Sequence, residues 1–129
     1  MLESYIENKK IEKIGNIYIL HRDDKVVSNF GKQWKKYRDV QIDSKNNFKL
    51  SYNFLQELCH FDLSIIKNKN ILEIGCGSGR FTEYLSKYGK SCTSIDLSDA
   101  IFHNVCKNNK NVKLLKVDFL KLKLNKKFD

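Results

Sequence analysis

Residues 71–82 read ILEIGCGSGRFT, and this stretch decides the fold of the chain. Its first four residues are mainly apolar, which is typical of a buried parallel strand. Glycine then occupies every second position, which allows a sharp turn and a close approach of the backbone to a bound molecule. Ser78 can cap the helix that follows, and Gly89 fits the end of that helix. Strand, glycine loop and helix together predict the first half of a nucleotide-binding α/β fold.

The spacing of the glycines indicates which nucleotide such a loop would hold. The dinucleotide fingerprint GxGxxG places its third glycine at the position of Arg80, whereas this loop reads GxGxG. Glu73 stands two places before the first glycine, and a pyrophosphate tolerates negative charge poorly. A ligand with positive groups suits an acid at the mouth of the loop better. S-adenosylmethionine carries an ammonium and a sulfonium group, so the sequence favours this cofactor.

The stretch ILEIGCGSGRFTEYL resembles motif I of the class I S-adenosylmethionine-dependent methyltransferases. The resemblance includes the acidic residue, the cysteine between glycines and the GRFT continuation. It implies an α/β, Rossmann-like methyltransferase fold. It also assigns cofactor binding to the residues of the loop, namely Glu73, Gly75, Cys76, Gly77, Ser78 and Gly79.

Two further strands are expected at residues 91–96 and 112–118, and each ends in an acid. In the family, the first acid binds the ribose hydroxyls and the next residue packs against the adenine. The second acid hydrogen-bonds the adenine amino group, and the following backbone N–H reads the ring. The resemblance assigns these roles, in order, to Asp96, Leu97, Asp118 and Phe119. Ser98 can cap a helix between the two strands. Each acid alone also fits a helix-flanking position, and it is their joint order that favours a cofactor site.

The length of the chain predicts an incomplete fold. The family's sheet has seven strands in the order 3-2-1-4-5-7-6, and this chain of 129 residues supplies the first three. Its last two residues, Phe128 and Asp129, resemble the opening of strand four. The strand at 71–74 would then be an open apolar edge, which natural sheets avoid. We therefore expect the N-terminal portion of a larger protein, with 66–129 as the first half of a methyltransferase domain. A short protein that pairs its edge in a dimer is the alternative.

Residues 1–65 are expected to form an N-terminal helical leader that caps the cofactor site. A short strand or hairpin is predicted at 14–20 with a turn at Gly15, followed by helices at 26–39 and 48–63. The second helix would bury one face, made of Phe48, Tyr52, Leu55, Leu58 and Cys59. The segment 30–44 is similar to a leader found in a branch of bacterial methyltransferases. That similarity rests on Phe30, Gln33, Trp34, Gln41, Asp43 and Ser44.

The net charge of +9 does not by itself predict a nucleic-acid partner. Arginine, whose fork reads phosphate and guanine, occurs only three times among the 24 basic residues. The lysines are scattered along the chain, so a solvated basic surface is the favoured interpretation. An RNA methyltransferase remains the runner-up, which a patch of lysines near the cofactor site would support.

Cysteine, histidine and the N-terminus suggest neither a metal site nor export. The four cysteines form no CxxC pair, and Cys59, Cys92 and Cys106 fit apolar faces. The three histidines are isolated, so no zinc site is predicted. The start, MLESYIENKK, lacks the apolar core of a signal peptide, and no segment approaches membrane-spanning length. A soluble cytoplasmic protein of unknown oligomeric state is expected.

Three functions are compatible with these patterns. The first is methyl transfer to a small-molecule or glycan-precursor acceptor, with this chain carrying the cofactor-binding half. The second is an RNA methyltransferase, and the third is a non-catalytic Rossmann fragment. Methyl transfer proceeds by direct attack on the sulfonium, for which orientation supplies much of the rate. His60 and Asp43 are within reach as candidate bases, and no catalytic residue is assigned.

Overall fold

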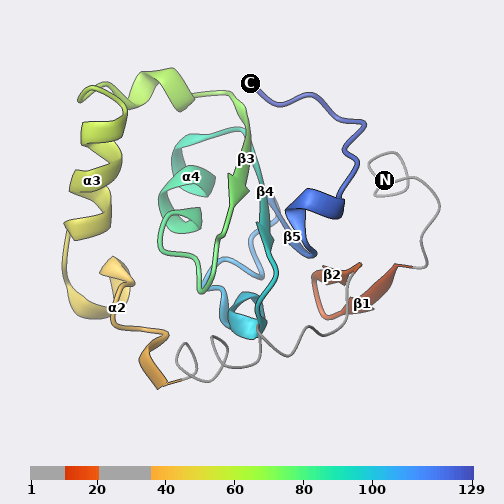
Figure 1. Cartoon of the computed structure of the whole chain (residues 1–129). Helices are drawn as coiled ribbons and strands as arrows, with labels where there is room; N and C mark the ends of the chain where they lie inside the picture. Colours follow the sequence, from red (N-terminus) through yellow and green to blue (C-terminus); the bar gives the residue numbers. More distant parts are fainter. Residues whose placement is uncertain (1–10, 21–35) are drawn as a thin grey trace.

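The computed structural model describes residues 11–20 and 36–129 (Figure 1). One five-stranded sheet, in the order β1-β2-β5-β4-β3, forms the centre of the described chain. Its strands are β1 (Glu12–Ile14), β2 (Ile17–Ile19), β3 (Asn70–Ile74), β4 (Ser91–Asp96) and β5 (Val112–Lys116). All neighbouring pairs are parallel except β1 and β2. The predicted α/β class with a mostly parallel sheet is confirmed.

The three strands expected around the glycine loop are present, with one correction. β3 and β4 have the predicted limits to within a residue, but β5 ends at Lys116 instead of Asp118. The next backbone amide, that of Val117, donates to the carbonyl of Asp96 at 3.0 Å, so β5 stays beside β4 past its last ladder residue. Asp118 then starts a 3₁₀ turn, Phe119–Lys121, because its side chain accepts a hydrogen bond from the Leu120 amide.

The predicted hairpin forms, and it belongs to the same sheet as the glycine strand. Gly15 takes a positive φ of 58° in the turn, which glycine adopts without a steric penalty. Ile17 and Ile19 are 4% and 5% exposed, because β2 runs parallel to β5 and buries this face. The hairpin therefore covers an edge of the sheet. The division into a leader at 1–65 and a domain at 66–129 stays a prediction.

Helix α4 (Thr82–Tyr88) follows the glycine loop, but Ser78 does not cap it. The residue before the helix is Phe81, and the Ser78 hydroxyl is buried without a hydrogen-bond partner among the described residues. The helix ends at Gly89 as predicted, although Gly89 is extended there with φ −79°. A Cβ at Gly89 would lie 2.6 Å from Cδ1 of Ile71, so close packing against β3 explains the glycine.

Between β4 and β5 the chain forms a 3₁₀ helix, Asp99–His103, in place of a full α-helix. Ser98 caps it as predicted, because its hydroxyl accepts a hydrogen bond from the Ala100 amide at 3.3 Å. Ala100 and Ile101 are buried against the sheet. This short connection holds the segment that follows Asp96 close to the glycine loop.

The leader forms shorter helices than the sequence predicted. Its described helices are α2 (Asp43–Asn46), α3 (Leu50–Leu58) and a 3₁₀ helix, Leu63–Ile66. The single helix expected at 48–63 is wrong, because His60 and Phe61 adopt positive φ angles of 50° and 60° and break it. Of its expected buried face, Leu55 and Cys59 are buried, whereas Phe48 and Leu58 are exposed. The helix expected at 26–39 lies mostly outside the described residues.

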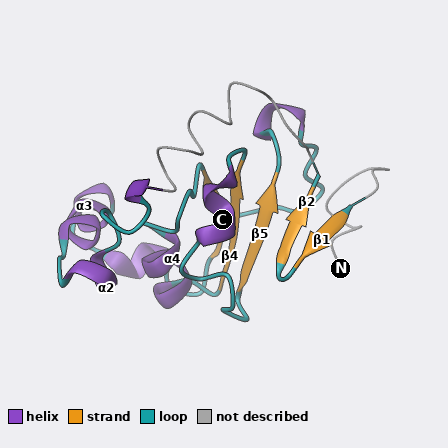
Figure 2. Ribbon diagram, turned by 90° about the horizontal axis from the view of Figure 1, so that it is seen from below, coloured by secondary structure: helices purple, strands orange, loops and turns teal. Residues whose placement is uncertain are grey.

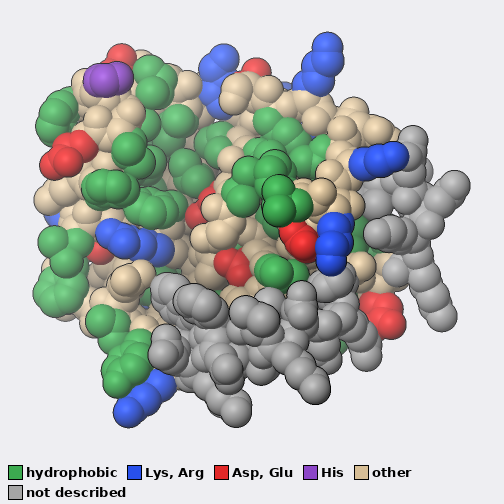
Figure 3. Space-filling model, in the orientation of Figure 1, with side chains coloured by type: hydrophobic (Ala, Val, Ile, Leu, Met, Phe, Trp, Pro, Cys, Tyr) green, Lys and Arg blue, Asp and Glu red, His purple; other side chains and the backbone are tan. Residues whose placement is uncertain are grey.

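The helices α2, α3 and α4 lie toward the end of the sheet opposite the hairpin (Figure 2). On one face of the sheet α4 packs on β4, and Leu85 and Cys92 share a buried cluster with Leu55 and Cys59 of the leader. On the other face Ile95, Leu115 and Val117 form a second cluster. Hydrophobic side chains gather on the surface around α3 (Figure 3). They include Leu50, Phe54, Leu58, Phe61 and Ile65.

Candidate cofactor site

The glycine loop turns at the carboxyl end of β3 and is fixed to β4. The backbone amides of Gly75 and Cys76 both donate to the carbonyl of Ile95, at 2.7 and 3.0 Å. All three glycines of the loop adopt positive φ angles, of 78°, 49° and 99° in chain order. An L-residue with a side chain adopts such angles only at a cost, so the alternating glycines are a backbone requirement.

The three glycines differ in the space that surrounds them. At Gly79 a Cβ would lie 2.7 Å from Oδ1 of Asn104, so packing within the protein excludes any side chain. At Gly75 and Gly77 an added Cβ would meet no atom of the described chain within 4 Å. The space above the first two glycines is therefore open, and a bound molecule can approach the backbone there.

Asp96 faces this loop from the end of β4. Its Oδ2 accepts a hydrogen bond from the Gly77 amide at 2.7 Å. Its Oδ1 accepts hydrogen bonds from the amide and the hydroxyl of Ser98, at 2.7 and 2.6 Å. A carboxylate has about four acceptor positions, so one remains for a ligand hydroxyl. Asp96 thus lies beside the open part of the loop, and its role as a ribose ligand stays a prediction.

Glu73 lies beneath the loop, not at its mouth. It is 9% exposed, and its Oε2 accepts hydrogen bonds from the hydroxyls of Thr82 and Ser94, both at 2.6 Å. Burial raises the pKa of Glu73, against a lowering by these two hydrogen bonds. The carboxyl group therefore connects β3, β4 and the start of α4, and it supports the loop from the protein side.

The remaining predicted residues divide between the protein interior and its surface. Cys76 is 3% exposed and packs with Ile17, Ile101 and Leu114, and this burial raises the pKa of its thiol. Leu97 is half-buried directly after Asp96. Asp118 caps the 3₁₀ turn after β5 and lies 3.6 Å from Nζ of Lys121, while Phe119 is 38% exposed. The surface location of Phe119 leaves it accessible to a ligand.

Asn104 is a site residue that the sequence did not reveal. It is 1% exposed, and its Nδ2 donates to the Thr82 hydroxyl at 3.2 Å and to the Gly77 carbonyl at 3.4 Å. Its Oδ1 accepts from the Cys106 amide at 2.9 Å. Asn104 therefore supports the glycine loop directly. The chain is rich in asparagine, so no sequence signal distinguishes this one.

Neither candidate base is placed for catalysis at the loop. Figure 1 shows the segment between α3 and β3, which carries the exposed His60, at the end of the sheet where β3 begins. Asp43 is 3% exposed and accepts hydrogen bonds from the Ser51 and Tyr52 amides and the Tyr84 hydroxyl. Burial opposes its ionisation, but these hydrogen bonds and the charge of Arg80 lower its pKa below the ordinary value.

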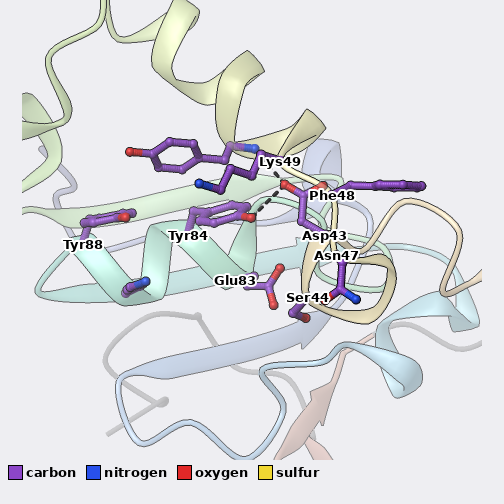
Figure 4. Close-up of a pocket in the computed structure, with 10 residues that line it drawn as sticks. Asp43, Ser44, Asn47, Phe48, Lys49, Glu83, Tyr84 and Tyr88 are labelled. Carbon is purple, nitrogen blue, oxygen red and sulfur yellow. Dashed lines mark hydrogen bonds between the residues drawn. The ribbon is translucent and has the colours of Figure 1, made fainter.

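A separate cavity of about 610 Å³ lies where the leader meets α4. Figure 4 shows Tyr84 of α4 pointing across this boundary to Asp43, with Tyr88 one turn further along the helix. The tyrosine rings pack against one another, with 5.5 Å between the centroids of Tyr52 and Tyr84. None of the predicted cofactor-binding residues lines this cavity.

Comparisons with known proteins show which family the sequence around this site resembles. Residues 71–129 match the sequence model of a family described as a methyltransferase domain. Residues 71–129 belong to this methyltransferase family. The match begins at the glycine strand and includes the loop, Asp96 and Asp118. The recognition of methyltransferase sequence from motif I is confirmed.

Individual relatives carry the same description. The ubiquinone biosynthesis O-methyltransferase of Coxiella burnetii strain RSA 493 is 33% identical over 54 residues, which are 42% of this chain and 23% of that protein. Protein 235L of Invertebrate iridescent virus 6, described as a candidate methyltransferase, is 32% identical over 96 residues. These are 70% of this chain and 34% of the viral protein. The chain thus spans about a third or less of these relatives.

Solved methyltransferase structures also align with the chain. A S-adenosylmethionine-dependent methyltransferase from Anabaena variabilis aligns with a TM-score of 0.48 and 21% identity, over 83% of this chain and 44% of that one. A S-adenosylmethionine-dependent methyltransferase from Aquifex aeolicus aligns with a TM-score of 0.43 and 23% identity, over 75% and 48% of the two chains.

Two further features bear on the class of protein. Within residues 11–20 and 36–129, no helix is long and apolar enough to cross a membrane. In the same part of the chain, no group of three or more His, Cys, Asp and Glu side chains could hold a metal ion. The cytoplasmic location expected from the sequence stays a prediction.

Proposed function

We propose that this methyltransferase sequence binds S-adenosylmethionine over Gly75 and Gly77 and transfers its methyl group to a small-molecule or glycan-precursor acceptor. The observation that carries the proposal is the hydrogen bond of 2.7 Å between the Gly77 amide and Asp96, beside open space. This hydrogen bond brings together the two parts of the chain that the sequence predicts to contact the cofactor. They are the glycine loop and Asp96, the acid assigned to the ribose.

The residues present fit this cofactor. Open space at the first two glycines admits the ligand to the backbone, and Asp96 keeps an acceptor position for a ribose hydroxyl. Phe119 is exposed at the end of the next strand, where the family places the adenine ring. Glu73 lies beneath the loop and accepts hydrogen bonds from the Thr82 and Ser94 hydroxyls. We therefore assign it the role of supporting the loop.

When bound, the cofactor supplies a methyl group on a positively charged sulfur. The chain's own contribution would be orientation: the loop and Asp96 fix the adenosine half, so that the methyl group faces the acceptor in one direction. Within the described residues no side chain is placed as a general base.

The surface charge supports a small acceptor over RNA. Blue Lys and Arg side chains are dispersed on the face drawn in Figure 3 and form no continuous patch. Arginine, the preferred residue for phosphate recognition, is rare in the chain. The Coxiella relative is named for ubiquinone biosynthesis, which is also consistent with a small-molecule acceptor.

Calorimetric titration with S-adenosylhomocysteine tests the cofactor assignment. Asp96→Asn should weaken binding about tenfold or more, because it replaces a charged acceptor of hydrogen bonds. Asp99→Asn is the matched control, since Asp99 is three residues away and pairs with Lys116 at 3.1 Å. Equal affinity of Asp96→Asn and the unmodified protein would refute the site.

The acceptor class needs a second experiment. The purified protein is incubated with S-adenosylmethionine labelled in its methyl group and with either a small-metabolite extract or total RNA from the same cells. Label in the metabolite fraction is expected. Label confined to RNA would replace the proposed acceptor with the runner-up.

A further inference from the structure

Arg80, the residue directly after the last glycine of the loop, is attached to the leader. Its Nε donates to the Ser51 hydroxyl at 2.9 Å. Its guanidinium lies over two aromatic rings, with 4.9 Å to the centroid of Phe81 and 5.9 Å to that of Phe54. Ser51 and Phe54 belong to α3, so this one side chain joins the leader to the loop.

The same junction contains a second connection. Asp43 accepts hydrogen bonds from the Ser51 and Tyr52 amides at the start of α3, at 3.2 and 3.0 Å. It also accepts one from the Tyr84 hydroxyl of α4, at 2.7 Å. The positive charge of Arg80 acts on the same carboxylate and contributes to lowering its pKa. Arg80, Ser51, Asp43 and Tyr84 are called the clasp below.

The position of Arg80 in the motif gives the clasp its significance. A dinucleotide-binding loop has glycine at this place, and a glycine would make none of these contacts. Gly79, whose φ of 99° is expensive for other residues, lies between the clasp and the cofactor side of the loop. A loop of three positive-φ residues keeps its shape only when its ends are held. Gly75 is held by Ile95 at one end, and Arg80 by α3 at the other.

We propose that Arg80 is a positioning residue that couples docking of the leader to binding of S-adenosylmethionine. The inference rests on the proposed function, because the loop must be the cofactor site. With the clasp closed, the loop is already in its binding conformation. With the clasp open, the loop samples other conformations, and the apparent affinity falls by the fraction of molecules that are competent. By linkage, a bound cofactor must stabilise the docked leader by the same factor.

The first test is a double-mutant cycle in affinity for S-adenosylhomocysteine, measured by calorimetry on protein shown to be folded. Arg80→Gln should weaken binding about fivefold, at the lower end of usual couplings between sites. Ser51→Ala should weaken it in the same direction, and the double variant should be no worse than Arg80→Gln alone. Arg38→Gln is the control, because Arg38 contacts His103 and Asp39 but not the clasp.

The second test reads the reverse effect, which a purely structural role would not produce. Hydrogen exchange is followed at the Ser51 and Tyr52 amides with and without S-adenosylhomocysteine. The ligand should slow exchange at these amides about fivefold in the unmodified protein and leave it unchanged in Arg80→Gln. If Arg80→Gln does not fold, Arg80→Lys replaces it. Lysine keeps the charge but loses the planar stacking and the Nε donor, so the same changes are expected.

The outcomes separate this inference from the proposed function. Binding by the unmodified protein with equal affinity in Arg80→Gln overturns the coupling and leaves the cofactor site intact. Additive effects of Arg80→Gln and Ser51→Ala also overturn it, because the two residues would then act independently. Absence of binding by the unmodified protein overturns the proposed function and this inference together.

Discussion

At Gly79 an added Cβ would lie 2.7 Å from Asn104 Oδ1, whereas at Gly77 it would meet no described atom within 4 Å. Gly79→Ala should therefore lower the free energy of unfolding by about 2–4 kcal/mol, from the left-handed backbone plus overpacking. Gly77→Ala should cost only about 1–2 kcal/mol, the backbone part alone. Urea unfolding measures both.

Ligand affinity gives these two variants a second comparison. The methyl group of Gly77→Ala would enter the open space over the loop, so this variant should lose affinity for S-adenosylhomocysteine while it remains folded. Normal affinity in Gly77→Ala would place the ligand elsewhere. A smaller loss of stability in Gly79→Ala than in Gly77→Ala would contradict the packing against Asn104.

Asp43 should make the stability of the protein depend on acid pH. Its folded-state pKa is lower than the ordinary value of 3.8, because its hydrogen bonds and Arg80 outweigh the effect of burial. The carboxylate therefore contributes stability above pH 3.8, and this contribution is lost as the pH falls through the lower folded-state value. Asp43→Asn should lower the unfolding free energy at neutral pH by about 1–3 kcal/mol.

The measurement is urea unfolding of both proteins from neutral pH down to about pH 3. The two stability curves should converge as the pH falls below 3.8, because the protonated aspartate loses its advantage over asparagine. If the two unfolding free energies differed by a constant amount across this range, ionisation of Asp43 would not contribute to stability. The Tyr84 hydroxyl should remain protonated throughout, since burial and Asp43 raise its pKa.

Among the elements, the sequence predicts best where one local pattern determines the structure. β3 and the hairpin follow from apolar runs with turn residues nearby, whereas β4, which reads SCTSID, was expected from the resemblance to the family. The prediction of a leader helix at 48–63 was wrong, because His60 and Phe61 adopt positive φ angles and α3 ends before them. Neither histidine nor phenylalanine is a residue type that predicts the end of a helix. Ser78 was wrong as a cap because the turn after Gly77 continues to Phe81 before α4 begins.

The site shows the same limit. Gly77 and Asp96 could be paired from the motif, since both lie at the carboxyl ends of adjacent parallel strands. Glu73 could be identified but not oriented, because its partners Thr82 and Ser94 come from two other elements. Asn104 was missed altogether, since its role depends on tertiary contacts with Gly77, Gly79 and Thr82.

The hairpin β1–β2 should contribute to the stability of the whole sheet. Ile17 is 4% exposed and packs in a cluster with Cys76 of the glycine loop and with Leu114 of β5. Ile17→Ala should lower the unfolding free energy by about 2–5 kcal/mol, the usual range for a buried isoleucine. Ile14→Ala is the matched control in the same hairpin, because Ile14 is 53% exposed and should change stability by less than about 0.5 kcal/mol.

Thermal unfolding followed by circular dichroism measures both variants, and one cooperative transition is expected for each. A second transition, with Ile17→Ala affecting only the earlier one, would mean that the hairpin folds apart from the glycine strand. That result would favour the sequence-based division at residue 65 over the continuous sheet.

At the scale of the whole molecule, β3 is an edge strand of the sheet in the described chain. β3 pairs with β4 on one side only. On its other side, among the described residues, the Asp129 amide donates to the Asn70 carbonyl at 3.0 Å. Figure 1 places α3 beyond β3 on this open side. Phe54 and Leu58 of α3 are exposed apolar side chains.

Hydrogen exchange can establish whether this edge is open in solution, because amides of a strand alternate between its two sides. The Asn70 amide points outward, to Asp129 Oδ2 at 2.7 Å, and the Gly75 amide points inward, to Ile95. The outward amides between them are those of Leu72 and Ile74. These should exchange at least about tenfold faster than the inward amides of Ile71 and Glu73, because only the inward amides face the β4 ladder.

Dilution distinguishes an open edge from one that a second copy covers. If two chains pair along β3, protection of Leu72 and Ile74 should rise with protein concentration, together with the mass seen by light scattering. Equal protection of all four amides in a dilute monomer would contradict the open edge. An unpaired apolar strand beside an apolar helix surface is a recognised site of association. We therefore expect the concentration dependence to appear first in these two amides, before any change at the hairpin.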